Sequence, residues 1–410
     1  MAKWRALVIT SKQAYIMIRE AIVIVDGART PMGGLSGALS AVTAPELAST
    51  AIRKVLDRSG IDPSLIEEVF MGCVLPAGLK QGPARQAARG AGIPDSAGAV
   101  TLNKLCGSGM QATIFAVDSI ASGTNSIAMA GGMESMTNAP YVMPGARSGL
   151  RMGHKQIFDH MFLDGLEDAY EGRAMGTFAQ ATADAYGITR EEMDAFAIES
   201  LTRAKNAIDN GSLVDEMAPV TVSSRAGDVL VSDDEQPHKA KVDKIPSLRP
   251  AFAKDGTITA ANSSSISDGA SALLLMTESK ARELGLKPLA RVVGHARHSQ
   301  HPSEFTLAPI GALSKLFTKI NWRAEDVDLF EINEAFAMVT MLAMREMELP
   351  HDKVNVYGGA CAQGHPIGST GSRIIVTLMH ALKNQGKQRG VAALCIGGGE
   401  ATAFAIEMIA

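Results

Sequence analysis

The chain has 410 residues, of which 46% are hydrophobic and 20% are charged, and its formal net charge is −4 at pH 7. This length suffices for roughly two or three domains with apolar cores, and the composition excludes a disordered, solvating chain. A slightly acidic chain lacks the basic face that general nucleic-acid binding requires, so no nucleic-acid partner is expected.

The cysteine spacing and the length of the apolar runs indicate the cellular compartment of the protein. Cys73, Cys106, Cys361 and Cys395 are far apart and form no C-x-x-C pair. Such spacing indicates free thiols, and we predict a cytoplasmic protein with no bound metal. No apolar run approaches the roughly 18 residues of a transmembrane helix, so no membrane partner is expected. Residues 1–18 precede the first apolar strand and are interpreted as an N-terminal extension outside the fold, with a weak organellar presequence as the alternative.

The first third of the chain alternates apolar strands with helices. The expected strands lie at 21–25, 69–74, 100–105 and 126–130, and the expected helices at 45–59 and 111–122. Continuous apolar strands separated by helices are typical of an α/β fold with a largely parallel sheet that is covered on both faces.

The last third repeats this order. The expected strands lie at 290–294, 327–332, 354–357 and 391–396, and the expected helices at 310–318 and 374–382. Short strings recur as well, since SIAMAGGME at 126–134 resembles AALCIGGGE at 392–400. We interpret the chain as an internal duplication, with an N-terminal core at 19–137 and a C-terminal core at 269–410. Two unrelated α/β units of similar periodicity are the alternative.

The segment at 138–268, between the two cores, differs in composition. It is richer in Met and in charged, helix-forming residues, and it contains the lysine-rich string HKAKVDK at 238–244. Its acidic pair Asp233-Asp234 is interpreted as a solvated turn. Insertions into a rigid scaffold often carry binding residues, so we expect a loop domain that contributes to the site.

A first candidate for chemistry is Cys106 in NKLCGSGMQA at 103–112, between an apolar strand and a helix. The backbone N–H groups and the dipole of a helix N-terminus favour anions, so we expect a lowered thiol pKa. A buried structural cysteine is the alternative. GSGMQA also fits a dinucleotide fingerprint, but Gly131-Gly132 stands where that fingerprint needs an acidic residue, which disfavours a nucleotide cofactor.

Three further turns carry polar or reactive residues. Asn333, in NEAFA after a strand, can orient a water or cap a helix. His365, in a glycine-rich loop, is a candidate general base or oxyanion donor, with a solvated loop histidine as the alternative. Cys395 ends the last buried strand and is a reactive thiol or a core residue. Gly397 begins a triple-glycine turn whose N–H groups can face a developing negative charge.

Together and in this order, the motifs resemble the thiolase family, the acetyl-CoA C-acyltransferases. The resemblance runs from about Arg19 to Ala410 and includes DGARTPMG (26–33), NKLCGSG, GGMESM (131–136), LRPAF (248–252), NEAFA, GHPIG (364–368) and CIGGGE. It implies a five-layered α/β/α/β/α fold in which two duplicated core halves pack together under the loop domain at 138–268. It also implies coenzyme A (CoA) and acyl-CoA as substrates, no permanently bound cofactor, and a homotetramer assembled as a dimer of dimers through the loop domain.

The resemblance assigns roles residue by residue. Cys106 is implied to be the nucleophile, His365 to take its proton, and Cys395 to exchange a proton with the substrate α-carbon. Asn333 is implied to hold a water in one oxyanion hole with His365, and the N–H groups of Cys106 and Gly397 to form a second hole. The residues implied to contact pantetheine or the acyl chain are Leu166, Met175, Phe252, Ala260, Ser264 and Phe336.

These roles fit reversible Claisen condensation and thiolytic cleavage of acetoacetyl-CoA, or of a somewhat longer or branched homologue, through an acyl-Cys106 intermediate. The reaction needs a nucleophile that also leaves well, a base near the α-carbon and donors for two oxyanions. A ketoacyl synthase-like condensing enzyme and a non-catalytic thiolase-like lipid carrier are the alternatives. Ala174, Gln363 and Glu400 depart from the usual family pattern and leave the acyl chain length open.

Overall fold

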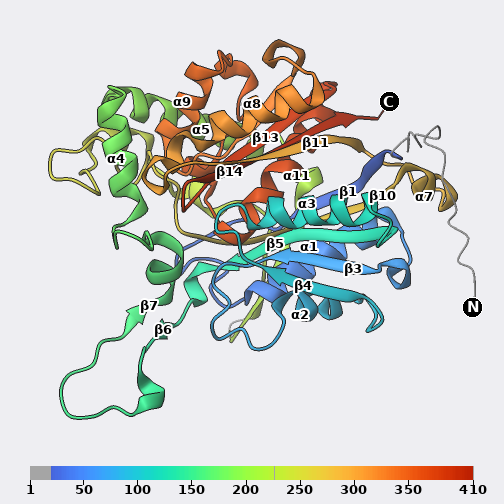
Figure 1. Cartoon of the computed structure of the whole chain (residues 1–410), viewed down its shortest axis with the longest axis horizontal. Helices are drawn as coiled ribbons and strands as arrows, with labels where there is room; N and C mark the ends of the chain where they lie inside the picture. The colour runs from blue at the N-terminus through green and yellow to red at the C-terminus, as the bar shows by residue number, and fades with distance from the viewer. Residues whose placement is uncertain (1–19, 226, 410) are drawn as a thin grey trace, which may run out of the picture.

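A computed structural model describes residues 20–225 and 227–409 of the chain (Figure 1). The extension predicted at residues 1–18 lies outside the described residues. The main strands are β1 (Ile22–Arg29), β3 (Glu68–Gly72), β4 (Gly98–Leu102), β5 (Ile127–Ser135), β10 (Ser267–Thr277), β11 (Ala290–Ser299), β12 (Leu329–Ile332), β13 (Arg389–Ile396) and β14 (Glu400–Met408). They are hydrogen-bonded in the order β12-β13-β14-β11-β1-β10-β5-β3-β4, and the short β2 (Gly33–Gly34) pairs with β10.

The sheet consists of two halves with the same topology. The N-terminal half runs β3-β5-β10-β1, with β4 as an additional edge strand parallel to β3, and the C-terminal half runs β12-β13-β14-β11. In both halves the first pair is parallel and the next two pairs are antiparallel. The halves meet where β1 pairs with β11, at Val23 with Arg291 and Ile24 with Ala290. The topology therefore repeats as expected for a duplicated fold.

The prediction of a largely parallel sheet is wrong. β10 and β14 are central strands that run antiparallel to both of their neighbours. β13 turns into β14 through Gly397–Gly399, with φ of +81° at Gly398 and +85° at Gly399, and a turn this tight can join only antiparallel strands. The strand predicted at 354–357 is also wrong, since Val354 makes only an isolated bridge to Phe330.

Helices cover the two halves and fill the space between them, which gives the expected five layers (Figure 1). α1 (Ala44–Ser59) and α2 (Pro83–Gly90) pack on the N-terminal half, and α8 (Ala308–Ile320) packs on the C-terminal half. α3 (Ser108–Ala121) and α11 (Ile367–Gln385) form the middle layer. β10 is apolar on both faces, because alternate residues of the strand enter two different hydrophobic cores. One core lies against α1, and the other lies in the middle layer.

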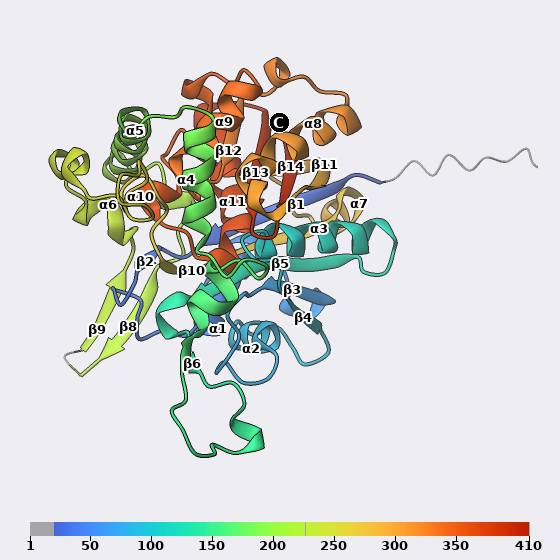
Figure 2. The same cartoon turned by 60° about the vertical axis from the view of Figure 1, so that its left-hand side comes forward.

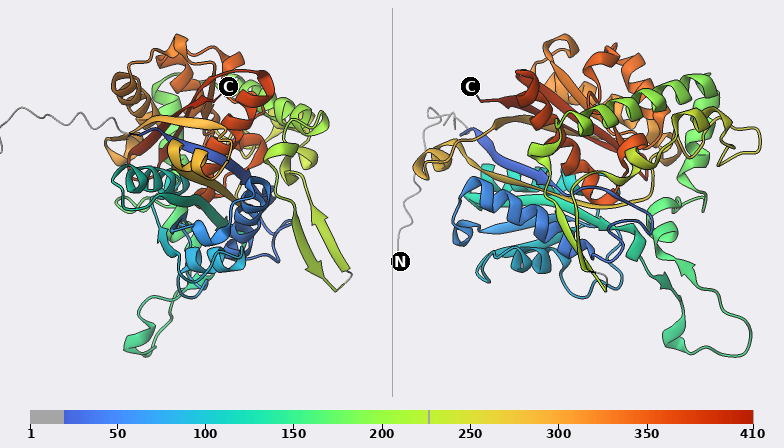
Figure 3. Two further views of the ribbon diagram at one scale, coloured as in Figure 1. Left: turned by 90° about the vertical axis from the view of Figure 1, so that its right-hand side faces the viewer. Right: turned by 180° about the vertical axis from the view of Figure 1, so that it is seen from behind.

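A chain segment between β5 and β10 carries further helices and two hairpins that project from the body (Figures 2 and 3). Its elements are β6 (Tyr141–Val142), β7 (Phe158–Asp159), α4 (Met175–Ala185), α5 (Arg190–Asp209), β8 (Val220–Ser224), β9 (Gly227–Val231) and α6 (Glu235–Lys239). The remaining helices are α7 (Glu278–Glu283), α9 (Ala337–Glu346) and α10 (Ala360–Gln363). Among residues 20–225 and 227–409, no helix is both long and apolar enough to cross a lipid bilayer.

One buried ion-pair cluster fastens the inserted segment to the core. The guanidinium of Arg29, on β1, donates to both carboxylate oxygens of Asp234 at 2.7 and 2.9 Å and also pairs with Glu216. All three side chains are fully buried. The interpretation of Asp233-Asp234 as a solvated turn is therefore wrong for Asp234, whose carboxylate also accepts from Met32 N–H at 2.9 Å.

Candidate active site

Cys106 lies on a tight turn between β4 and α3. Leu105, directly before it, has a left-handed backbone with φ of +49°, a conformation that costs energy for a residue with this side chain. The turn is held by Leu105 N–H donating to Asn103 Oδ1 at 2.8 Å and by Lys104 N–H donating to Ser108 Oγ at 2.8 Å. A Cβ at Gly107 would collide with the side chain of Ile396, so this turn packs directly against the end of β13.

His365 lies in the loop between α10 and α11 with a defined tautomer. Its Nδ1 is 2.6 Å from Thr370 Oγ1, and the same hydroxyl donates to Pro366 O at 3.0 Å. Since the hydroxyl has only one proton, Nδ1–H must be the donor to Oγ1, which leaves a lone pair on Nε2. Nε2 is buried and has no protein hydrogen-bond partner, so it is free to accept a proton.

Cys106, His365 and Gly397 line one pocket of about 380 Å³ between the two core halves and the inserted segment. The aromatic wall includes Phe252, whose ring meets Phe336 edge-on at 6.0 Å. Most of the other lining side chains are apolar. All six residues that the sequence assigned to substrate contacts line this pocket: Leu166, Met175, Phe252, Ala260, Ser264 and Phe336.

Cys395 and Asn333 do not line the pocket and are buried at the ends of β13 and β12. Burial raises the pKa of the Cys395 thiol well above its usual range, and a negative charge on Cys106 raises it further, which indicates that the two sulfurs interact. Asn333 donates its backbone N–H to Ala393 O at 3.0 Å, whereas both of its side-chain polar atoms lack a protein partner. A buried amide in this state is suited to hold a water or a substrate oxygen.

Glu134, at the end of β5, is a site residue that the sequence analysis missed. Its buried carboxylate accepts from Val74 N–H at 3.0 Å, Leu75 N–H at 3.1 Å and Gly368 N–H at 2.9 Å. It thereby ties the loop of His365 to the turn after β3. Burial raises its pKa to about 7, although the three N–H donors oppose this shift. The only sequence signal was its place in the GGMESM motif.

Glu334, beside Asn333, is a second buried carboxylate that connects separate segments, as Glu134 does. It accepts from Ser200 Oγ at 2.8 Å, from Asn355 Nδ2 at 2.8 Å and from Cys361 N–H at 3.1 Å. These bonds connect α5 and the start of α10 to the NEAFA turn. The sequence pointed to this turn, but it did not separate the unpartnered Asn333 from the fully bonded Glu334.

The electrostatics of the pocket differ from the sequence expectation. Burial raises the pKa of Cys106 to about 11, while the backbone N–H groups of Gly397 and of Cys106 itself act in the opposite direction. Burial and the nearby charge of Arg373 lower the pKa of His365 to about 3. The expectation of a lowered Cys106 pKa is therefore wrong, because desolvation outweighs the helix N-terminus. The resting pair is a neutral thiol beside a neutral imidazole.

Known proteins match nearly the whole length of this chain. Residues 22–279 match the family described as "Thiolase, N-terminal domain" and residues 286–408 match "Thiolase, C-terminal domain". A probable acetyl-CoA acetyltransferase of Dictyostelium discoideum is 47% identical, over 95% of this chain and 94% of the relative. An acetyl-CoA acetyltransferase of Chromobacterium violaceum is 46% identical, over 94% of this chain and 99% of the relative.

Solved structures give the same result. The Bacillus anthracis acetyl-CoA acetyltransferase superposes with a TM-score of 0.93 at 40% identity, covering 95% of this chain and 99% of that one. The Acat5 thiolase from Ascaris suum, solved in complex with coenzyme A, has a TM-score of 0.90 at 40% identity, covering 95% and 100%. Matches to both thiolase domains, in chain order and over nearly all of the chain, show that the chain belongs to the thiolase family.

Proposed function

We propose that this chain is an acyltransferase that catalyses reversible thiolytic cleavage and Claisen condensation of a 3-ketoacyl-CoA through an acyl-Cys106 intermediate. The observation that carries this proposal is that Cys106, the buried His365 with its free Nε2, and Gly397 line one apolar pocket. The complete Cys-His-Cys set, with Cys395 beside Cys106, disfavours a ketoacyl synthase-like enzyme and a non-catalytic lipid carrier.

In the cleavage direction, Cys106 Sγ attacks the 3-keto carbon and its proton passes to His365 Nε2. Because the thiol pKa is about 11 and the imidazole pKa about 3, this proton leaves as the C–S bond forms and not before the substrate binds. The oxyanion of the adduct accepts from the N–H groups of Cys106 and Gly397, which also oppose the rise in thiol pKa that burial causes.

The adduct then breaks its bond between C2 and C3. Acetyl-CoA leaves as an enolate, whose oxygen is held by His365 and by a water on Asn333, and Cys395 protonates its α-carbon. The thiol of a second CoA then gives its proton to the Cys395 thiolate and attacks acyl-Cys106. The Cys106 thiolate leaves and takes its proton back from His365. Condensation is the reverse sequence, and both directions give ping-pong kinetics.

The acyl group that we propose is the acetoacetyl group or a somewhat longer or branched homologue. Ala174 caps the start of α4 and presents only a methyl group to the pocket. Phe162, Phe305 and Ile367 add apolar surface to the same lining. Comparison of acetoacetyl-CoA with 2-methylacetoacetyl-CoA and 3-ketohexanoyl-CoA tests this range, and efficient turnover of acetoacetyl-CoA alone would restrict the enzyme to the shortest chain.

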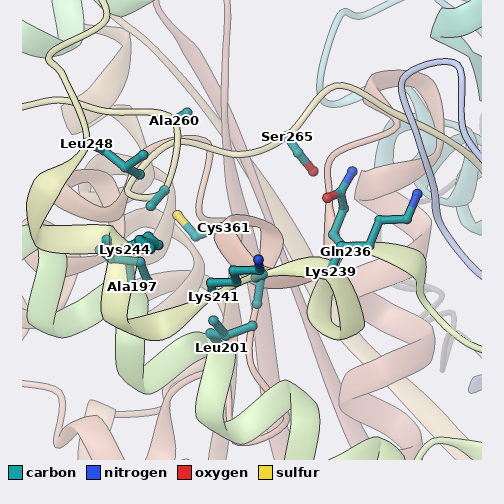
Figure 4. Close-up of a pocket in the computed structure, with 14 residues that line it drawn as sticks. Ala197, Leu201, Gln236, Lys239, Lys241, Lys244, Leu248, Ala260, Ser265 and Cys361 are labelled. Atoms are coloured by element: carbon teal, nitrogen blue, oxygen red, sulfur yellow. The ribbon is translucent and has the colours of Figure 1, made fainter.

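We propose that the nucleotide part of CoA lies in a neighbouring pocket of about 340 Å³ (Figure 4). This pocket shares Ala260 and Ser265 with the catalytic pocket and is lined by Lys239, Lys241 and Lys244. Lys239 pairs with Glu235, and Lys244 lies 3.9 Å from Asp243. These lysines belong to the string HKAKVDK at 238–244, for which a phosphate site and a solvated loop were both open from the sequence. Their place along this pocket supports the phosphate site.

The nucleotide site is tested with Lys241→Gln and the exposed control Lys315→Gln on α8. We expect Lys241→Gln to raise the KM for CoA several-fold with kcat unchanged. The substitution removes a positive charge that faces the CoA phosphates, and it does not alter the site of the CoA thiol. Lys315→Gln should match the wild type. An unchanged KM in Lys241→Gln would place the phosphates elsewhere.

We further propose a cytoplasmic homotetramer. The segment around the β6–β7 hairpin projects from the body and exposes Tyr141, Leu150, Met152 and Ile157 by 58% or more (Figures 1 and 2). Apolar side chains gathered on such a projection are typical of an association surface. The four free thiols fit a reducing compartment. Mass photometry should give four chains per particle, and a monomer would contradict the proposal.

The proposed activity is tested by thiolysis of acetoacetyl-CoA with free CoA, with the wild type beside Cys106→Ser. We expect rapid formation of acetyl-CoA that collapses in the variant. Turnover that requires an acyl carrier protein would support the ketoacyl synthase-like alternative. Tight acyl-CoA binding without turnover, also for the longer and branched substrates, would support the lipid carrier.

A further inference from the structure

The two backbone donors of the proposed oxyanion hole come from different halves of the fold. Cys106 follows β4 of the N-terminal half, and Gly397 follows β13 of the C-terminal half. Among the described residues, no main-chain hydrogen bond joins the turn at 103–108 to the turn at 396–400. The spacing of the two N–H groups must therefore be fixed by other contacts.

An ion pair crosses between the two turns. Lys104 Nζ, two residues before Cys106, pairs with Glu400 Oε2, three residues after Gly397. The other carboxylate oxygen of Glu400 accepts from Ser299 Oγ at 3.3 Å. The two side chains are 23% and 35% exposed, so the pair is partly shielded from solvent.

Both ends of the pair are anchored to rigid elements. The backbone N–H of Lys104 donates to the hydroxyl of Ser108, the first residue of α3. Glu400 is the first residue of β14, in register with Ile396 of β13 and Ser299 of β11. A force between the two charges is therefore transmitted to the turns that hold the two donors.

The two turns also pack directly against each other. A Cβ at Gly397 would lie 3.0 Å from Leu105 Cδ1, and Gly107 lies directly against the side chain of Ile396. A small change in their separation would move one N–H group relative to the other, and misplacement of reacting groups by about 1 Å can cost on the order of 100-fold in rate. Neither Lys104 nor Glu400 lines the catalytic pocket, so each acts through its turn.

We propose that Lys104 and Glu400 form a clasp that sets the spacing of the Cys106 and Gly397 N–H donors and makes both side chains positioning residues for the acyl-transfer steps. This inference rests on the proposed function, because the clasp acts on the oxyanion hole of that reaction. Its effect falls on the transition state, since these donors face a neutral thiol in the resting enzyme and a full negative charge in the tetrahedral adduct. Loss of the clasp should lower kcat and leave the KM for CoA nearly unchanged.

The test uses the full-length protein with Lys104→Met, Glu400→Gln, the double variant, and the charge swap Lys104→Glu with Glu400→Lys. The control is Lys383→Met, which removes an exposed ion pair with Asp215. We expect each single variant to lose about tenfold or more in kcat with KM within about twofold. The double variant should lose no more than the single variants. The swap should recover part of the loss, and the control should match the wild type.

A second measurement does not require turnover. Because the two N–H groups favour the Cys106 thiolate, loosening them should raise its pKa and slow its alkylation by iodoacetamide several-fold. Full kcat and unchanged alkylation in the single variants would overturn the clasp. A rise in KM without a fall in kcat would overturn it in favour of Lys104 as a contact to a CoA phosphate. A wild type without thiolysis would refute the proposed function, and the alkylation rates would still decide whether the clasp exists.

Discussion

Glu134 offers a prediction whose magnitude follows from the hydrogen bonds around one carboxylate. Its Oε2 accepts from Val74 and Gly368, and its Oε1 accepts from Leu75. In Glu134→Gln the amide oxygen can keep two of these donors, but the amide NH₂ faces the third. One buried N–H group is then left without an acceptor, which costs about 1–3 kcal/mol. Glu134→Ala would leave all three without one and should cost more than about 3 kcal/mol.

The cost of Glu134→Gln depends on pH with a defined sign. The pKa of Glu134 is raised from 4.5 to about 7 in the folded protein. A carboxyl group with a raised folded pKa stabilises the fold below about pH 4.5 and loses that contribution as the pH rises to about 7. Glutamine does not titrate. The stability advantage of the wild type over the variant should therefore shrink by about 3 kcal/mol between about pH 4.5 and 8.

Urea denaturation at matched protein concentration, followed by circular dichroism across this pH range, measures the effect of the Glu134 variants. Glu67→Gln is the control, because Glu67 is exposed and accepts a single N–H, from Ser126 at 2.6 Å. We expect the free energy of unfolding of this variant to stay within about 0.5 kcal/mol of the wild type, because Glu67 lies on the surface and glutamine keeps an acceptor for Ser126. A Glu134→Gln difference that does not change with pH, or a Glu134→Ala variant as stable as the wild type, would refute the reasoning.

Three further predictions follow from other parts of the structure. Arg29→Met removes the partner of two buried carboxylates and should cost about 3–5 kcal/mol in urea denaturation, whereas Lys383→Met should leave the midpoint unchanged. Alkylation of Cys106 by iodoacetamide should accelerate about tenfold per pH unit between about pH 7 and 10, because the thiol pKa is about 11; a plateau near neutral pH would show a resting thiolate. Gly132→Ala should fail to accumulate as folded protein, because a Cβ there collides with the Gly368 carbonyl oxygen, and recovery of a stable, active variant would contradict the close packing of β5 against α11.

The sequence predicted most of the local structure and the composition of the pocket. The predicted helix at 45–59 is α1 (Ala44–Ser59), because a capping box of Thr43 and Glu46 begins it and Gly60, with φ of +69°, ends it. Cys106, His365 and Gly397 were predicted because each lies in a short motif next to the end of a strand or helix, whereas the six substrate-contact residues were assigned from the resemblance to the thiolase family. Such motifs are local in sequence, so they can be read without the fold.

Properties that depend on contacts distant in sequence could not be predicted. The antiparallel pairing of β10 is set by its return from the inserted segment after more than a hundred residues. Asp234 resembles a surface residue until Arg29, 205 positions away, is placed beside it. The raised pKa of Cys106 also depends on distant contacts. The helix N-terminus is local in sequence, but Cys106 is buried against a hydrophobic cluster that includes Leu75, Met161 and Ile367.

The measurement that tests the account most directly is the trapping of the acyl-enzyme. The wild type, Cys106→Ser and Cys395→Ser are mixed with acetyl-CoA, quenched with acid and analysed by intact mass and peptide mapping. We predict one acetyl group on Cys106 in the wild type and in Cys395→Ser, and none in Cys106→Ser, with condensation lost in both variants. An acetyl group on Cys73, Cys361 or Cys395 of the wild type, or turnover with no covalent adduct, would contradict the account.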